Sequence, residues 1–416
     1  MKRKYIIVVL LLFTSCRLFA QATIEEYRRE VVDYSLELDI SGLHVERAEA
    51  DMERAKRGYM PLVELGGEQS LALQKQGGGK LLTGSIRLGA GQTIYRGGAV
   101  RSAVRRAAIT HERSEVDWEI TMMDVCYAAD AAYWELSRAE ALHMIIEEYV
   151  AAVDSLRGIV ERRFNEGYSA KGDLLQVTSR MSDARYRLSQ TEQSYLIALH
   201  RYNALRGVAL GESVVLGDNM FDAMPMPERE DVVALVEHHP LVRYSMLQSE
   251  YARWGITSAQ APFLPAIDVG IHGALMPKDA SSNGRVVSGA VTLSLTTPIF
   301  HFGERRAAMR SAKLAYHEEL LRGEDVVDNL RRDEADAWIN LTNSYHRVVA
   351  ALSSLDIARE NLTMSIYSYG EGMATILDVL QAQISWLQIC ENVVSAYYDY
   401  AMAHVAYDYV TARCVR

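Results

Sequence analysis

"EGYSAKGDLLQ" at residues 166–176 returns as "EGMATILDVLQ" at residues 371–381, in the same register and 205 residues further along a chain of 416. Each phrase carries a glycine, Gly167 or Gly372, with an aspartate six residues later, and each lies between long segments without proline. Glycine adopts positive φ without steric cost, so it lets a chain leave one helix and turn back into another. The phrase therefore predicts the tip of a helical hairpin, and the chain contains it twice.

Other parts of the chain are duplicated at almost the same spacing. "YMPLVELG" from Tyr59 matches "FLPAIDVG" from Phe263, and "IYRGGAVRSAVRRA" from Ile94 matches "IFHFGERRAAMRSA" from Ile299. Three separate matches at one spacing indicate an internal two-fold repeat. The predicted order is a signal peptide at 1–20, a first repeat at 21–206, an irregular linker at 207–229 and a second repeat at 230–416.

The N-terminus resembles a secretory signal. Three basic residues at 2–4 precede a short apolar run at 6–13, which is the pattern of an exported protein. The small residues Ala20 and Ala22 suit cleavage after either one. A rival interpretation is lipidation at Cys16, because "FTSC" loosely resembles a lipobox.

Composition excludes several classes of protein. Acidic residues outnumber basic ones, 54 to 44, whereas surfaces that bind nucleic acid are usually basic. After the signal no run of eighteen apolar residues occurs, so no transmembrane helix is expected. Cys126, Cys390 and Cys414 are odd in number and lack metal or framework spacing, so we expect three small buried hydrophobic residues.

Long helices dominate the predicted structure. Residues 99–164 contain no proline, and their apolar residues recur at spacings of three and four. At 1.5 Å per residue this helix is about 100 Å long, too long for a compact domain. The segments 303–368 and 374–410 share the pattern, so the long helices are expected to pack as coiled coils.

Each repeat also contains two segments with the period of a β-strand. Val269 and Leu293 alternate with the polar residues Asp268 and Ser294, so each strand has one apolar and one polar face. The expected strands cover about 61–73, 83–96, 265–276 and 287–301. A sheet with one face on a protein core explains this alternation, and so does an outer-membrane barrel.

The ends of the strands favour the barrel. Polar loops such as "KQGGGK" join the strands at one end, and aromatic residues gather at the other, namely Tyr59, Tyr95, Phe263, Phe300 and Phe302. A sheet in lipid cannot keep open edges, and four strands are too few to close. Several chains must therefore share one barrel.

Enzymatic chemistry finds no support in the sequence. The pair His238 and His239 directly precedes Pro240, where exposed histidines at a helix start are more common than a metal site. The glycines at Gly77 lack the Lys-Ser/Thr of a phosphate-binding loop. We therefore expect no catalytic residue, no metal and no cofactor.

Taken together, the repeated "YMP"-type motif before the strands, the "I-[YF]-x-[GF]-G" motif after them and the "E-G-x-x-x-x-x-D-[LV]-L-Q" turn resemble the TolC-like outer membrane efflux protein family. These are the outer membrane factors of tripartite efflux or type I secretion systems. The resemblance covers essentially the whole mature chain. It implies an α+β membrane protein in which a long α-helical coiled-coil barrel continues a transmembrane β-barrel shared by three chains, with four strands per chain.

The resemblance also implies a function and partners. Such proteins form homotrimers in the outer membrane, in contact with its lipid, and extend into the periplasm. They are passive conduits that dock with a periplasmic adaptor (membrane fusion) protein and an inner-membrane transporter, and they bind no nucleic acid. The alternative is a periplasmic coiled-coil scaffold without a channel.

Site residues follow from the same resemblance. The hairpin tips, near 166–173 and 369–378, are expected to carry the adaptor-contact residues Glu166, Gly167, Tyr168, Glu371, Gly372 and Met373. The residues implied at a periplasmic constriction or gate are Asp378, Gln381, Asp173 and Tyr369. A helix-capping role for the two aspartates is the simpler alternative.

Two departures from the family pattern concern the closed state. Gln381 stands where some members have a second acid, and Ala374 stands near a position where some have a basic residue that locks the turn. Tyr369 remains at the position whose hydroxyl would reach Asp173, so we expect that link between the hairpins.

Overall fold

The computed structural model describes residues 22–71, 82–222, 224–279 and 282–415, in two compact units. One unit comprises the chain up to Asp39, Ile120–Val236 and Asn329–Arg416, and the other comprises Ile40–Glu119 and Glu237–Asp328. The signal peptide, Cys16 and Gly77 lie outside the described residues.

The elements follow the same order in both halves of the chain. Helices α4 and α8 have 67 residues each, and α5 and α9 have 35 each. The first half contains α2 (Ile24–Tyr34), α3 (Leu36–Lys56), the 3₁₀ turn η1 (Arg57–Tyr59), β1 (Leu62–Leu71), β2 (Leu82–Arg96), α4 (Ala99–Asn165) and α5 (Lys171–Leu205). The second contains α6 (Val232–His238), α7 (Pro240–Gln260), η2 (Ala261–Phe263), β3 (Ala266–Asp279), β4 (Ser282–Thr296), α8 (Glu304–Gly370), α9 (Ile376–Val410) and η3 (Arg413–Val415).

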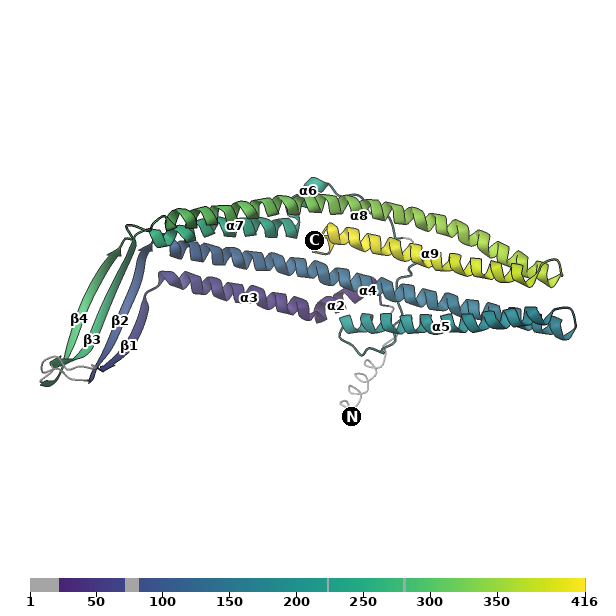
Figure 1. Cartoon of the computed structure of the whole chain (residues 1–416), viewed down its shortest axis with the longest axis horizontal. Helices are drawn as coiled ribbons and strands as arrows, with labels where there is room; N and C mark the ends of the chain where they lie inside the picture. Colours follow the sequence, from purple (N-terminus) through teal and green to yellow (C-terminus); the bar gives the residue numbers. More distant parts are fainter. Residues whose placement is uncertain (1–21, 72–81, 223, 280–281, 416) are drawn as a thin grey trace, which may run out of the picture. The chain divides into compact units, whose positions relative to one another are not determined.

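The four strands form one antiparallel sheet in the order β1-β2-β3-β4 (Figure 1). Strand β4 ends at Thr296, five residues before the expected end. Pro298 explains the early end, because proline has no N–H to donate to a strand ladder.

The sheet has one apolar face and one polar face, as the alternation predicts. On the polar face Thr93 donates to Asp268, and His272 and Thr292 share a hydrogen bond. On the apolar face Val269 lies opposite Leu293 and Ile271 opposite Val291. This apolar face is bare, with side chains 57–74% exposed at Leu65, Leu88, Val291, Leu293 and Leu295.

The hairpins α4–α5 and α8–α9 lie side by side in the first unit (Figure 1). Their common core holds residues from all four helices, namely Ile146, Tyr149 and Val153 of α4, Met181 and Ala184 of α5, Ala358 of α8, and Trp386, Leu387 and Cys390 of α9. This packing fixes the two hairpin tips next to each other.

The cysteine prediction is wrong for two of the three residues. Cys126 of α4 forms a disulfide with Cys414 of η3, with Cα atoms 6.6 Å apart and a sequence separation of 288. The spacing of the cysteines along the chain does not predict this disulfide, because it forms only when the C-terminus packs against α4. Cys390 is a buried free thiol, as expected.

Hydrogen bonds hold the linker between the two halves, residues 207–229, in place. The side chain of Asn203 donates to the carbonyls of Leu210 and Glu212. The Asp218 carboxylate accepts from the Ile24 amide at 2.7 Å, and Ala22 forms a bridge with Leu216. The irregular linker thereby anchors the beginning of α2.

Candidate functional site at the hairpin tips

Both tips use the same backbone motif to end the outgoing helix. Gly167 has φ +83° and donates to the Phe164 carbonyl, while Tyr168 donates to the Arg163 carbonyl. Gly372 has φ +75° and donates to the Tyr369 carbonyl, while Met373 donates to that of Ser368. This is the Schellman arrangement, which satisfies the last carbonyls of a helix and favours glycine at its left-handed position. The repeated phrase is thus a pair of matched helix ends.

The two aspartates cap the returning helices. Oδ2 of Asp378 accepts hydrogen bonds from the Thr375 amide at 2.8 Å and the Thr375 hydroxyl at 2.7 Å. The Thr375 oxygen in turn faces the Asp378 amide at 3.4 Å, which completes a capping box. Asp173 reaches back to the Ala170 amide, but alanine has no side-chain acceptor, so that box is only half formed.

The charge of Asp378 is favoured by its cap. The hydrogen bond from the Thr375 side chain, followed by that from its backbone amide, lowers the pKa of Asp378 below its ordinary value. The side chain is exposed, as is Gln381 one turn further along α9. Residues three apart share a helix face, so α9 presents a carboxylate and an amide together.

The expected link between Tyr369 and Asp173 is absent. Tyr369 is only 6% exposed, and its hydroxyl has no hydrogen-bond partner within the described part of the chain. Oδ2 of Asp173 instead accepts from the Ser169 hydroxyl at 2.8 Å. The ring of Tyr369 belongs to an apolar cluster at the tips with Leu156, Val160, Val177, Ile376, Val379 and Leu380. Its role here is packing.

A basic residue that the sequence interpretation missed joins the two tips. Nη1 of Arg163, at the end of α4, donates to the carbonyls of Tyr369 at 3.0 Å and Gly370 at 2.9 Å, at the end of α8. The guanidinium also lies 5.0 Å from the centre of the Tyr369 ring. The only sequence signal for this contact is a charged residue three places before the first tip. The matching position in the second tip, 368, is a serine.

The expected adaptor-contact residues lie at the surface. Tyr168 is 75% and Met373 is 72% exposed, two large side chains at matching places in the two tips. The four residues beside them, Glu166, Gly167, Glu371 and Gly372, are exposed as well. Each tip therefore offers an apolar side chain next to a carboxylate.

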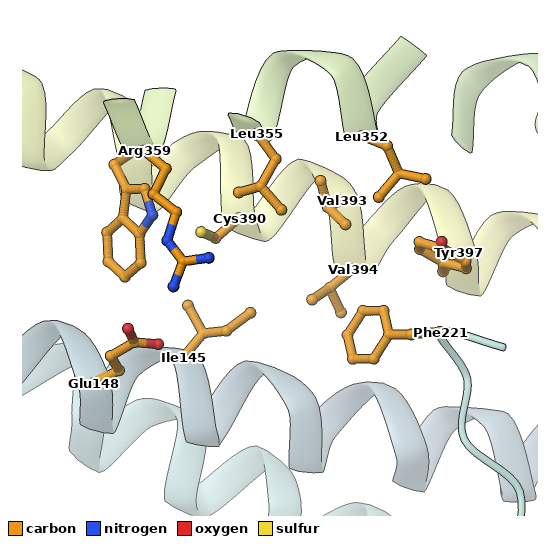
Figure 2. A pocket seen from close by; sticks show the side chains of 11 residues that line it. Ile145, Glu148, Phe221, Leu352, Leu355, Arg359, Cys390, Val393, Val394 and Tyr397 are labelled. Carbon is orange, nitrogen blue, oxygen red and sulfur yellow. The ribbon is translucent and has the colours of Figure 1, made fainter. Parts of the chain in front are cut away.

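A cavity of about 360 Å³ lies between α4, α8 and α9, away from the tips (Figure 2). Glu148 and Arg359 lie at one end, Phe221 and Tyr397 lie at the other, and apolar side chains line the middle. Cys390 faces this cavity, and burial raises the pKa of its thiol to about 11. The thiol therefore remains protonated and unreactive at neutral pH.

Over the described ranges, no group of three or more His, Cys, Asp or Glu side chains is arranged to hold a metal ion. Nor does any described helix combine the length and apolar character needed to cross a bilayer.

Comparison with known proteins identifies the family. The sequence model of the outer membrane efflux protein family matches residues 29–208 and again 233–407. The outer membrane efflux protein BepC of Brucella suis is 20% identical over 337 residues, which is 80% of this chain and 72% of BepC. The alkaline protease secretion protein AprF of Pseudomonas aeruginosa is 24% identical over 255 residues, covering 58% of this chain and 52% of AprF.

A solved structure shares the fold. The outer membrane protein VceC of Vibrio cholerae superposes with a TM-score of 0.80 at 18% identity, over 94% of this chain and 96% of VceC. The chain belongs to the outer membrane efflux protein family. It is an outer membrane channel protein that extends into the periplasm.

Proposed function

We propose that three copies of this chain form a passive outer membrane channel that exports substrates delivered by an inner-membrane transporter through a periplasmic adaptor. The observation that carries this proposal is the sheet, whose apolar face is bare and whose two edges are free. Among the described residues β1 pairs with β2 alone, and β4 with β3 alone.

Free edges and a bare apolar face support pairing with further copies of the chain. In lipid, each unpaired N–H or C=O of an edge strand costs several kcal/mol. Pairing β4 of one copy with β1 of the next satisfies both edges and keeps the apolar side chains on the outside. Three copies give the twelve strands that the family resemblance implies, with the polar face lining the lumen.

The helices also present surface for a neighbouring copy. Apolar side chains remain exposed along α5 and α8, at Leu175, Tyr186 and Ile197 of α5 and at Ile339, Val349, Ile357, Met364 and Tyr367 of α8. Stripes of this kind on a monomer mark protein contact surfaces. We infer that α5 of one copy covers α8 of the next.

The hairpin tips then act as the periplasmic gate and the docking site. Three copies of Asp378 form a ring whose negative potential attracts cations and disfavours anions. Tyr168 and Met373, both exposed, are the proposed anchors for the adaptor. The relatives are named for efflux and for protease secretion, so we assign the choice of cargo to the transporter.

The test is the mass and the location of the assembly. Outer membranes from cells expressing the full chain are extracted in mild detergent, and the mass of the complex is determined by light scattering. We expect a complex of three chains in the outer membrane fraction. A soluble periplasmic monomer or dimer would instead support a coiled-coil scaffold whose sheet covers protein.

A further inference from the structure

Arg163 connects the two hairpin tips through backbone atoms. Its guanidinium donates to two consecutive carbonyls, of Tyr369 and Gly370, in the last turn of α8. Helix geometry provides no i+4 amide within the helix for these last carbonyls, which carry the negative end of the helix dipole. The carbonyl of Tyr369 also accepts from the Gly372 amide of its own tip. A cation from the neighbouring hairpin therefore neutralises the end of α8 and satisfies it at the same time.

Within the described ranges this link occurs once, although the tips are repeated. The position in the second tip that matches Arg163 is Ser368, which is too short to reach the first hairpin in return. Arg163 is also placed over the Tyr369 ring, so separation of the tips would break two charge-assisted hydrogen bonds and a cation–π contact together. Arg163 thus gives the first hairpin a polar hold on the end of α8, in addition to the apolar cluster that both hairpins share.

We propose that Arg163 is the residue that locks the two tips of each chain together in the closed channel. It takes the place of the basic residue missing at Ala374 and of the hydroxyl link that Tyr369 does not make. The apolar cluster beneath the tips supports the lock through non-directional contacts, whereas the two hydrogen bonds are directional and fix the end of α8 in position. This proposal rests on the gate described under the proposed function.

The first test measures the separation of the tips directly. Val177 is fully buried in the tip cluster, so a Val177→Cys variant reacts with a maleimide only when the hairpins part. We expect Arg163→Ala to speed this labelling about tenfold in the detergent-solubilised protein, because local opening becomes easier. Arg162→Ala is the matched control, since Arg162 is the adjacent arginine and is exposed.

The second test measures the channel. In planar bilayers, Arg163→Ala should raise the conductance several-fold over the wild type, and Arg162→Ala should leave it unchanged. Arg163→Lys, which keeps the charge but loses the planar guanidinium, should lie between the two. This conservative variant also serves if the alanine variant folds poorly.

The outcomes separate the lock from the channel. Equal labelling rates in the Arg163→Ala, Arg162→Ala and parent proteins would overturn the lock, whatever the conductance. If the wild type forms no channel but Arg163→Ala still speeds labelling, the lock stands as a contact between hairpins and the channel proposal fails.

Discussion

Cys126 and Cys414 are joined by a covalent bond, whereas Cys390 remains a free thiol inside the helical core. The bond ties the C-terminal turn to α4, beside the ion pairs that Arg413 makes with Glu230 and Asp408. An oxidising compartment such as the periplasm allows such a bond to form and persist. At the residue scale, the three cysteines therefore have two different chemistries.

Alkylation distinguishes these chemistries. In the native protein at pH 8, Cys390 should react with iodoacetamide about a hundredfold more slowly than an exposed thiol, because its raised pKa leaves little thiolate. Denaturation without reductant should give one modified cysteine per mature chain, and reduction should raise the number to three. Three modified cysteines without reductant, counted by mass spectrometry, would show that the disulfide does not form.

At the scale of elements, the strands of the sheet place neighbouring residues in opposite surroundings. Leu293 is 73% exposed on the apolar face, while the adjacent Ser294 lies on the polar face and donates toward the Asp268 carbonyl. Because the side-chain period of a strand is two residues, these neighbours form a matched pair for testing which face meets lipid.

Arginine placed at each position provides the test. Leu293→Arg should disrupt membrane assembly, because a charge facing lipid near the bilayer midplane costs about 2 to 4 kcal/mol. Ser294→Arg should assemble normally, since it faces the proposed lumen. Assembly is measured as the heat-resistant oligomer recovered from outer membranes. Normal assembly of both variants would contradict the lipid-facing assignment.

At the scale of the whole molecule, the proposed trimer brings three copies of Asp378 together. Asp378→Ala should lower the preference for cations in planar bilayers by roughly twofold or more, because it removes the charge of the ring. Asp173→Ala is the matched control: it removes the capping acid at the same position of the other returning helix. Equal losses in both variants would contradict the special role proposed for the Asp378 ring.

The pH dependence of this selectivity has a defined sign. The pKa of Asp378 is lowered, so its carboxylate is more populated at any pH than that of an ordinary aspartate, whose pKa is about 3.9. The cation preference should therefore be present at neutral pH and be lost in acid, as the pH falls through the pKa of the ring carboxylates. The cap contribution to stability has the same sign: it is present above the unfolded pKa and is lost as the pH falls through the folded one.

Local patterns in the sequence determined most of the architecture. A glycine six residues before an aspartate marked both tips, the absence of proline marked the long helices, and strict alternation marked the two-faced sheet. These signals are readable because helix and strand periods, turn residues and caps depend on neighbours within a few positions. Strand β4 begins and ends five residues earlier than expected, at Ser282 and Thr296, and its early end has a local cause, Pro298.

Only the tertiary structure decided which distant residues meet. Cys126 and Cys414 are 288 residues apart, and Arg163 reaches a carbonyl 206 residues away. Whether the Tyr369 hydroxyl met Asp173 depended on how the hairpins pack, and packing turned the ring into an apolar cluster instead. Such contacts arise from the fit of side chains between helices, which no local period encodes. The sequence therefore predicted the channel fold and two hairpin tips, and the packing decided which residues join those tips.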